Sequence, residues 1–384
     1  MKIAVVNSNM VKMYRGTKKG TEIFGRLLIN GLAKRAAKEK LQITAFASGN
    51  SKLPVPIESV NYQASIDDKS VGIKHHTLFE LALISKAFSM QKRFDLFHAS
   101  TGIAEYILPF AQLIPNKPIL ITLHGPLNYV FQKKFFTLFK NLPNVFFVSI
   151  CNAQRKPIPD LNYIKTIYHG IDIYKNFPFN QTGSDQIIWT GRAIPDKGLD
   201  VFLTVVKKVR KKAKVFPIIK EESLDWLNRE FIKKRSTISQ ILKIYIDFDV
   251  DRVELAKQYQ TSKLFLFPVQ FEEAFGLTLI ESMACGTPVV AYARGSIPEI
   301  VKDGETGFIV NSSDDDIRGN WIIKKTGIEG LCEAVERIYA MPEDQYKQMR
   351  LNCRAHVEKN FTVEHMVDQY VEVYKEILAK KSTS

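Results

Sequence analysis

The chain has 384 residues, with 54 Lys and Arg against 40 Asp and Glu, which gives a formal net charge of +14. At roughly 100–200 residues per domain, this length predicts two domains. A hydrophobic fraction of 45% and a charged fraction of 24% are typical of a folded globular protein, and they exclude a fibrous repeat or a largely disordered chain.

The cysteine spacing and the lengths of the apolar runs further limit the classes of protein that fit this sequence. The four cysteines are scattered with no C-x-x-C spacing, which favours neither a zinc knuckle nor a disulfide framework and fits a reducing compartment. The N-terminus lacks the apolar core of a signal peptide, and no apolar run approaches the roughly 20 residues of a spanning helix. We therefore expect a cytoplasmic protein with no transmembrane segment.

The positive charge is confined to the first half. Residues 1–180 carry 24 basic and 10 acidic side chains, whereas residues 181–384 carry 30 of each. Such a field concentrates anions, so a phosphorylated substrate, an anionic membrane surface and nucleic acid are all compatible with it, as is a merely solvated surface. The basic stretch at residues 207–214, KKVRKKAK, is interpreted as the solvated end of a helix.

In chain order, the first half alternates short apolar runs with helical patterns. Strands are predicted at residues 2–6, 43–47, 96–98, 119–123, 145–150 and 164–168, and a long helix at residues 21–40. Continuous apolar runs between helices indicate a parallel sheet that is covered on both faces. Residues 130–142, VFQKKFFTLFKNL, predict an amphipathic basic helix, which suits either its own domain or a membrane surface.

After a linker-like segment at residues 172–186, the pattern begins again. Strands are predicted at residues 187–190, 216–219, 241–246, 264–267, 287–291 and 308–310. The sequence therefore predicts two doubly wound α/β domains facing each other across a cleft at the carboxyl ends of their strands. Helical periodicity at residues 362–379 predicts a terminal helix that packs on a domain.

The most informative stretch is EEAFGLTLIESMACG, residues 272–286. It predicts a short helix that starts near Phe275 or Gly276 and stops at Gly286, so that its first amides suit a phosphate group. Glu273 lies just before this helix and Glu281 within it. Because carboxylates repel an anion, they make sense as acceptors for hydroxyl groups on either side of the phosphates, such as those of a sugar and a ribose.

A second loop supplies positive charge. The segment GRAIPDKG follows the predicted strand at residues 187–190 and carries Arg192 and Lys197. These cations are suited to neutralising a diphosphate leaving group. The run Asp314 to Asp316 follows a turn, and we interpret it as helix capping and not as a metal site.

Together these motifs resemble the retaining glycosyltransferases of glycosyltransferase family 4, which have the two-domain GT-B fold. The resemblance is strongest between residues 190 and 310, and it includes ACGTPVVAYARGSIPEIVKDGETGFIV after the Glu273 and Glu281 pattern. It implies an N-terminal acceptor-binding domain at residues 1–175, a nucleotide-sugar donor domain at residues 176–360 and a C-terminal helix at residues 361–384 that packs back on the first domain.

The resemblance also implies roles for individual residues. Glu273 would contact the donor sugar hydroxyls, Glu281 the ribose, and Arg192 with Lys197 the diphosphate. Backbone amides at Phe275, Gly276 and Leu277 would bind the distal phosphate. In the first half, Gly20 matches a glycine-bearing turn near the donor and His124 a histidine near the reacting sugar, while His98 is expected on a cleft wall.

The sequence departs from the family at two loops that border the base. Family members usually carry glycine there, whereas this chain has Lys220 to Glu222 in one loop and Asp247 to Asp249 in the other. The choice of nucleotide is therefore left open.

These observations predict a retaining glycosyltransferase that needs no metal or other cofactor and moves a sugar from a nucleoside diphosphate sugar to an acceptor hydroxyl. The expected role is in carbohydrate biosynthesis. An anionic or lipid-linked acceptor, peripheral contact with the inner face of a membrane through the basic half, and no nucleic-acid partner are expected. The alternatives are a nucleotide-sugar epimerase of the same fold and a non-catalytic sugar-nucleotide binding protein.

Overall fold

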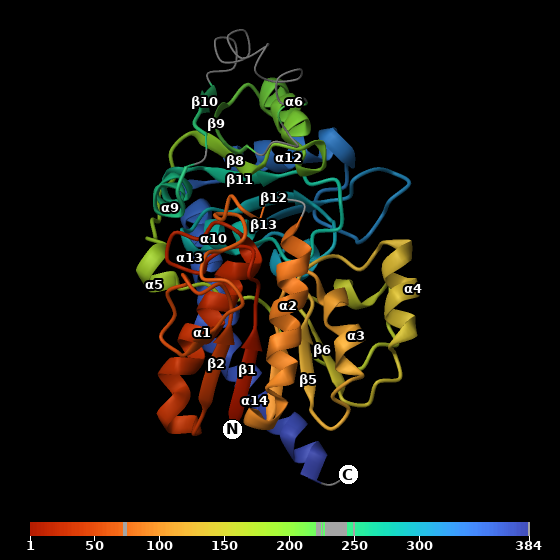
Figure 1. Ribbon diagram of the computed structural model, residues 1–384. Helices are drawn as coiled ribbons and strands as arrows, with labels where there is room; N and C mark the ends of the chain where they lie inside the picture. The colour runs from red at the N-terminus through yellow and green to blue at the C-terminus, as the bar shows by residue number, and fades with distance from the viewer. Residues whose placement is uncertain (72–74, 220–223, 225, 227–243, 249, 383–384) are drawn as a thin grey trace. The chain divides into compact units, whose positions relative to one another are not determined.

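The computed structural model describes residues 1–382 apart from 72–74, 220–223, 225, 227–243 and 249. The chain forms two compact units (Figure 1). Unit 1 consists of Met1–Gly170 together with Val363–Ser384, and unit 2 consists of Ile171–Thr362. Unit 1 is therefore discontinuous in sequence, and its last helix comes from the C-terminal end of the chain.

Unit 1 is built on a parallel sheet. Its described residues form seven strands in the order β3-β2-β1-β4-β5-β6-β7. The strands are β1 (Lys2–Val6), β2 (Gln42–Phe46), β3 (Ile57–Glu58), β4 (Leu96–Ala99), β5 (Ile119–Thr122), β6 (Val145–Ser149) and β7 (Tyr163–Thr166). Every pair is parallel, and Ile3 of β1, for example, lies opposite Ile43 of β2 and Leu96 of β4.

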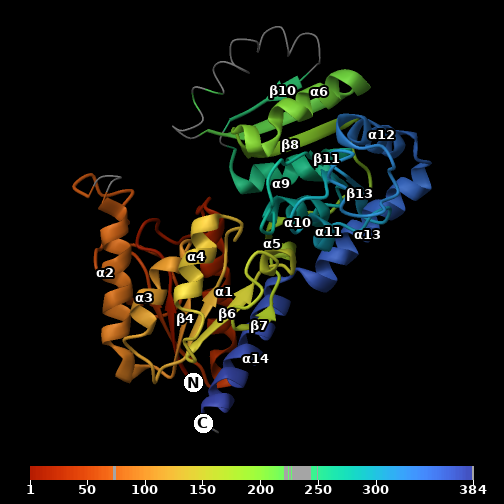
Figure 2. The same cartoon turned by 90° about the vertical axis from the view of Figure 1, so that its right-hand side faces the viewer.

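Helices cover both faces of this sheet, because alternate side chains of each strand point to opposite faces. Ile3 and Val5 pack with α1 (Gly20–Glu39) and α14 (Val363–Ser382). Ala4 and Val6 pack with the other helices, which Figure 2 shows on the opposite side of the sheet. These helices are α2 (His76–Ser89), α3 (Leu108–Ala111) and α4 (Val130–Leu138), with single 3₁₀ turns η2 (Gln91–Arg93), η3 (Ala104–Tyr106) and η4 (Ala153–Arg155).

The contact between α1 and α14 is close, because Gly31 provides no side chain there. A Cβ atom at Gly31 would lie 2.5 Å from Cγ2 of Val367. Val367, Tyr370 and Tyr374 of α14 are buried against the sheet and α1. The terminal helix is thus an integral part of the core of unit 1.

Unit 2 has the same construction. Its described residues form six parallel strands in the order β10-β9-β8-β11-β12-β13. The strands are β8 (Gln186–Arg192), β9 (Lys212–Ile218), β10 (Ile244–Ile246), β11 (Leu264–Phe267), β12 (Val289–Tyr292) and β13 (Gly307–Val310). The helices are α5 (Ile173–Asn176), α6 (Leu199–Val209), α9 (Arg252–Thr261), α10 (Leu277–Ala284), α11 (Ile297–Ile300), α12 (Gly327–Ala340) and α13 (Glu343–Asn360), with the 3₁₀ turn η5 (Pro195–Lys197).

The prediction of two doubly wound parallel sheets is confirmed, and the differences lie at the edges of elements. The two-residue edge strand β3 was not predicted. The basic stretch at residues 207–214 is only partly a helix end, because Arg210 adopts the left-handed conformation (φ 52°) after α6 and β9 begins at Lys212. Residues 241–243 of a predicted strand lie outside the described residues, and β10 covers the rest.

No helix among the described residues is both long and apolar enough to cross a membrane.

Unit 2 is held together by a buried arginine. Arg350 of α13 is fully buried, and its guanidinium donates hydrogen bonds to the Tyr346 hydroxyl and to backbone carbonyls. These carbonyls belong to Asn180 (2.9 Å), Gln260 (2.9 Å), Ser262 (2.8 Å) and Cys285 (3.3 Å). One side chain therefore ties α13 to the segment before β8, the end of α9 and the end of α10.

We predict that Arg350→Met destabilises the chain by about 3 kcal/mol or more, because several buried carbonyls lose their donor at once. Urea unfolding followed by circular dichroism measures this loss. Lys347→Met, a partly exposed position on the same helix, is the matched control and should change the midpoint little. Equal midpoints for the two variants would contradict the role assigned to Arg350.

Candidate functional site

The predicted motif residues of unit 2 lie where the strand order of its sheet reverses. The chain runs outward from β8 through β9 to β10 on one side, and from β11 through β12 to β13 on the other. In doubly wound sheets, ligands bind outside the carboxyl ends of the strands at this switch point. Arg192 is the last residue of β8, Lys197 lies in the loop that follows, and Glu273 lies in the loop that leaves β11.

The loop after β8 turns sharply and touches the loop after β11. Arg192 is exposed at the end of β8, and residues 195–197 make a single 3₁₀ turn before Gly198. Gly198 has φ +69°, and a Cβ atom there would lie 2.1 Å from the carbonyl oxygen of Pro268. The Gln270 amide also donates to the carbonyl of Asp196 at 2.8 Å. Glycine at position 198 is thus required by both its backbone conformation and the contact.

This contact brings two of the predicted site residues together. The ammonium of Lys197 lies 2.8 Å from Oε2 of Glu273, and the two side chains are only 15% and 13% exposed. The same ammonium lies 4.5 Å from the centroid of the Phe271 ring. A partly buried cation beside a carboxylate and an aromatic face is held in one place, so Lys197 and Glu273 form a preorganised pair.

The predicted helix after Glu273 is confirmed as α10, with Gly276 in the left-handed conformation (φ +79°) at its N-cap. Phe275 is buried just before it, and its carbonyl accepts a hydrogen bond from the Ser296 hydroxyl at 3.0 Å. Leu277 is the first residue of the helix. The first amides of any helix have no acceptor within the helix and carry the positive end of its dipole, so this terminus suits an anionic group.

Glu281 has a partner that the sequence did not reveal. It is buried in α10, and its carboxylate forms an ion pair with the guanidinium of Arg252 at the start of α9. Asp251 caps α9 by accepting from the amides of Val253 and Glu254. A cation in the first turn of a helix opposes the helix dipole. This unfavourable placement is the sequence signal that Arg252 pairs with a carboxylate outside its own helix.

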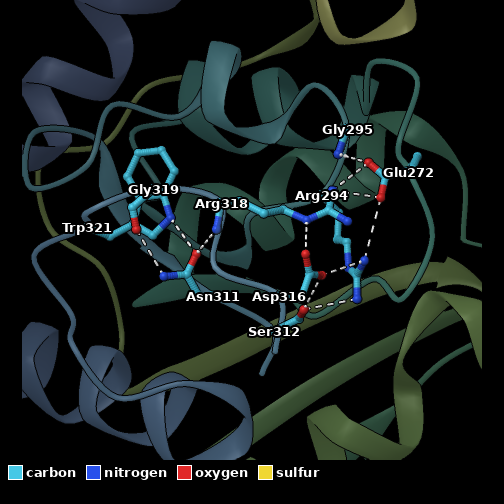
Figure 3. Close-up of polar contacts among 9 residues, drawn as sticks. All are labelled: Glu272, Arg294, Gly295, Asn311, Ser312, Asp316, Arg318, Gly319 and Trp321. Atoms are coloured by element: carbon cyan, nitrogen blue, oxygen red, sulfur yellow. Dashed lines mark hydrogen bonds and ion pairs between the residues drawn. The ribbon is translucent and has the colours of Figure 1, made fainter. Parts of the chain in front are cut away.

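A second group of charges, which no sequence pattern indicates, lies beside Glu273. Glu272, Arg294, Asp316 and Arg318 alternate in sign (Figure 3). Nη1 of Arg318 lies 2.7 Å from Oε1 of Glu272, and its Nε lies 2.7 Å from Oδ1 of Asp316. Nη1 of Arg294 lies 2.9 Å from Oδ2 of Asp316. We call these four residues the ion cluster.

The ion cluster fixes the backbone that carries Glu273. Glu272 accepts a hydrogen bond from the Gly295 amide at 2.7 Å, and the Ser296 amide donates to the carbonyl of Glu273 at 2.9 Å. A Cβ atom at Gly295 would lie 2.2 Å from that same carbonyl oxygen. The segment before α10 is therefore packed tightly against the turn at residues 294–296.

The ion cluster also corrects the interpretation of the aspartate run. Residues 313–316 form a turn closed by a bridge between Ser313 and Asp316, and no helix begins there. Asp314 accepts from the Thr326 hydroxyl at 2.7 Å, and Asp316 joins the two arginines. Asn311 orders the following loop by accepting from the Arg318 amide and the Trp321 indole (Figure 3). The expected helix capping is wrong.

We predict that Glu272→Ala lowers the free energy of unfolding by about 1 kcal/mol, because the Gly295 amide loses its acceptor and two arginines are left close together. Thermal unfolding measures the change. Glu305→Ala is the control, since Glu305 is exposed and its pair with Lys302 is 4.0 Å long. If both variants melt at the same temperature, the ion cluster does not hold this segment.

Two predicted residues belong to unit 1. Gly20 is the first residue of α1 and is exposed. His124 follows β5, packs against the rings of Phe24 and His169 and lies 3.3 Å from the Ser100 hydroxyl. Burial, with His169 nearby, holds the pKa of His124 well below its ordinary value of 6.5. Its imidazole is therefore neutral near pH 7 and offers one donor and one acceptor nitrogen.

His98 does not line a cleft. It is fully buried in β4, where its ring nitrogens lie 2.6 Å from the Tyr374 hydroxyl of α14 and 2.8 Å from the Thr122 hydroxyl of β5. Burial lowers its pKa to about 3. His98 is thus a core residue that links the sheet to the terminal helix.

The lowered pKa of His98 predicts a loss of stability in acid. Between pH 3 and 6.5 the unfolded chain binds a proton on this residue that the folded chain does not, so the free energy of unfolding falls as the pH drops below 6.5. At pH 5 this difference in proton binding lowers the free energy of unfolding by about 2 kcal/mol. Urea unfolding at pH 7.5 and 5.0 should show a smaller difference for His98→Gln than for the parent chain.

His365→Gln is the control for this experiment, because His365 is exposed on α14. Its pH difference should stay closer to that of the parent chain than the difference of His98→Gln does. If His98→Gln keeps the full pH difference of the parent chain, His98 is not the source of the stability lost in acid.

Within unit 2 the structure joins Lys197 to Glu273 shortly before α10 and places Arg192 at the end of β8, while Gly20 and His124 lie in unit 1. No three or more His, Cys, Asp or Glu side chains of the described residues are grouped to hold a metal ion. Of the two loops expected to border the base, residues 220–222 and 249 lie outside the described residues. Asp247 accepts a hydrogen bond from the adjacent Phe248 amide at 2.9 Å.

Comparison with known families gives a match over the part of the chain that contains this site. Residues 171–325 match the family described as glycosyl transferases group 1, a range that contains Arg192, Lys197, Glu273 and Glu281. Among solved structures, the chain is similar to a sucrose-phosphate synthase from Thermosynechococcus elongatus, with a TM-score of 0.72, 17% identity and 99% of each chain covered. It is equally similar to HepE of Anabaena in complex with UDP and glucose, with a TM-score of 0.72, 17% identity, and 98% and 100% coverage. The fold is that of the GT-B glycosyltransferases.

Curated relatives match parts of the chain. An uncharacterised 41.2 kDa protein of the cps region of Klebsiella pneumoniae is 26% identical over 224 residues, which are 56% of this chain and 55% of the relative. The N-acetyl-alpha-D-glucosaminyl L-malate synthase of Bacillus anthracis is 30% identical over 149 residues, 37% and 35% of the two chains. The D-inositol 3-phosphate glycosyltransferase of Gordonia bronchialis is 36% identical over 120 residues, 31% and 23% of the two chains. The chain spans about half the length of the first of these relatives and less of the other two.

Proposed function

We propose that the protein is a glycosyltransferase that moves a sugar from a nucleoside diphosphate sugar to an acceptor hydroxyl, with retention at the anomeric carbon. The observation that carries the proposal is the Lys197–Glu273 pair, which joins the loops after β8 and β11 at the switch point of unit 2. The match of residues 171–325 to glycosyl transferases group 1 and the UDP complex of the HepE neighbour support it.

Charge stabilisation of the leaving group is the main chemical work proposed for unit 2. When the bond between the sugar and the diphosphate breaks, negative charge develops on the diphosphate. Lys197 and Arg192 would stabilise that charge, and the first amides of α10, at Leu277 and its neighbours, would bind the distal phosphate. A single donor of this kind is typically worth ~2.7–4 kcal/mol in the transition state.

The acidic residues would bind hydroxyl groups. Glu273, held beside Lys197, would accept hydrogen bonds from the donor sugar, and its pairing keeps the carboxylate from repelling the diphosphate. Glu281 is proposed to accept from the ribose while Arg252 neutralises its charge. Phe275 and Gly276 would shape the turn that presents the amides.

In unit 1, the resemblance to family members supports a proposed contact of His124 with the reacting sugar and of Gly20 with the donor. A neutral imidazole at His124 would bind a sugar hydroxyl as donor or acceptor without adding charge. Because no strong nucleophile stands next to Glu273 in the motif, we propose same-face attack by the acceptor assisted by the departing phosphate. We propose that no metal ion or cofactor takes part.

The acceptor is proposed to be anionic or lipid-linked, since residues 1–180 carry the whole net charge. A cytoplasmic enzyme of carbohydrate biosynthesis that contacts the inner face of a membrane peripherally would fit this charge.

The test is the release of nucleoside diphosphate from a panel of UDP-, GDP- and ADP-sugars. We expect slow release from one donor even without acceptor, and a fall of about 10²–10³-fold in Lys197→Ala and Glu273→Ala, because each removes a group aimed at the reacting centre. Circular dichroism confirms that the variants fold.

Lys302→Ala and Glu305→Ala are the matched controls, since these residues form an exposed pair in the same unit. They should leave release unchanged. Absence of both release and calorimetric binding for every donor would refute the proposed function, and conversion of one nucleotide sugar into another without release would indicate an epimerase.

A further inference from the structure

Unit 1 contains a pocket that the chemistry above does not use. It has a volume of about 710 Å³, within the range of roughly 300–1,000 Å³ that is usual for small-molecule sites. Its lining is mainly apolar and comes from three sources: α2 supplies Leu81, η3 and α3 supply residues such as Tyr106 and Phe110, and α4 supplies Phe131 and Phe135.

The pocket lies at the carboxyl ends of two neighbouring strands. Gly102 and Ile103 of its lining follow β4, and Tyr129 lies in the connection from β5 to α4. The strand order of unit 1 reverses between β1 and β4, so this is the edge at which a doubly wound sheet binds ligands.

The loop after β4 also joins the pocket to the unit 1 residues of the proposed site. Ser100 lies 3.3 Å from Nε2 of His124. A Cβ atom at Gly102 would lie 3.6 Å from the hydroxyl of Thr21, the residue after Gly20. One short loop after β4 therefore carries both the pocket residues Gly102 and Ile103 and the contact of Ser100 with His124.

Two polar side chains of the pocket wall, Gln132 and Glu105, bind each other. Nε2 of Gln132 donates to Glu105 at 3.0 Å, and Oε1 of Gln132 accepts from the Tyr129 amide at 3.3 Å. Apart from this pair and the tyrosine hydroxyls, the wall is mainly hydrocarbon and aromatic ring. Such a wall favours an alkyl or isoprenoid chain over a sugar, since sugar hydroxyls would lose their hydrogen bonds to water.

The surroundings of the pocket are cationic. From residue 106 to residue 159 the sequence contains six Lys and Arg residues and no Asp or Glu, and the lining acid Glu105 accepts a hydrogen bond from Gln132. Lys133 and Lys134 are exposed on α4 beside the lining residues Phe131, Gln132 and Phe135. Tyr129 and Phe131 are also exposed, and their rings stack with centroids 5.9 Å apart. An apolar cavity in a positive field is complementary to an amphiphile with an anionic head.

We infer that this pocket binds the apolar chain of an anionic amphiphile, with the head group toward the basic surface of α4 and the segment of His124. The next step rests on the proposed function: the amphiphile is then the acceptor of the sugar. The acceptor class is then a lipid phosphate or a molecule of the same chemistry.

Binding is tested without any donor, using the anionic fluorescent amphiphile 1-anilinonaphthalene-8-sulfonate on the full chain. We expect saturable binding that octyl phosphate displaces. Octanol should need about tenfold higher concentration, and inorganic phosphate should not compete. Ile103→Glu, which places a charge at the apolar wall, and Phe131→Ser should each weaken probe binding by about tenfold.

Leu113→Glu and Leu138→Ser are the matched controls. Both positions are exposed apolar residues of unit 1 outside the pocket lining, at 68% and 76% exposure. They should leave probe binding unchanged. Because Ile103 and Phe131 are themselves 44% and 62% exposed, their variants are expected to fold.

Equal probe binding in all four variants would overturn the inference, as would displacement by inorganic phosphate at the concentrations that suffice for octyl phosphate. Octanol as effective as octyl phosphate would overturn the anionic head group. Calorimetry with UDP and GDP on the same preparations separates the two proposals. If the probe results hold while no nucleotide binds, the proposed function fails and the ligand class of the pocket is supported.

Discussion

The geometry of the site depends on one steric constraint, the contact of Gly198 with the carbonyl of Pro268. No side chain fits there, and no other residue adopts φ +69° as easily. The contact sets the spacing of the loops after β8 and β11, and therefore lets Lys197 reach Glu273 at 2.8 Å. Glu273 is in turn held from its other side by the turn at Gly295 and Ser296. The electrostatics of the site are thus a consequence of backbone packing.

This dependence explains which parts of the fold and the site could be predicted from the sequence. The strands of both sheets are short apolar runs, and buried parallel strands have that pattern because helices cover both faces. The parallel order then places the residues after β8 and β11 at one edge, so Lys197 and Glu273 could be placed in a common site before their contact was seen. The start of α10 was also predictable, since Gly276 and the apolar spacing after it are local signals. Strand β3 has only two residues and carries no such pattern.

Other parts of the site left no local signal. The partners of the ion cluster are far apart in sequence, and Glu272, Arg294 and Arg318 have neither a shared spacing nor a common element. Asp316 stood in an aspartate run that suggested capping, but the arginines that bind it are specified only by the folded chain. The pairing of Glu281 with Arg252 was hidden for the same reason, although an arginine after a capping aspartate hints at a distant acid. His98 shows the converse case, because its place at a strand end predicts a residue on a cleft wall, whereas it is a hydrogen-bonding group of the core.

The discontinuity of unit 1 has a consequence for how the chain is made. Its first 170 residues leave the ribosome before unit 2, yet the helix that completes its core, α14, is synthesised after all of unit 2. Until then Val367 does not cover the surface around Gly31. The ring nitrogen of His98 likewise has no contact with the Tyr374 hydroxyl. Unit 2 is contiguous in sequence, so it has all its residues while the older part of the chain still exposes an apolar face. Completion of the N-terminal unit is therefore a late step in biogenesis, and the nascent chain is most exposed to aggregation or chaperone binding on the α1 face.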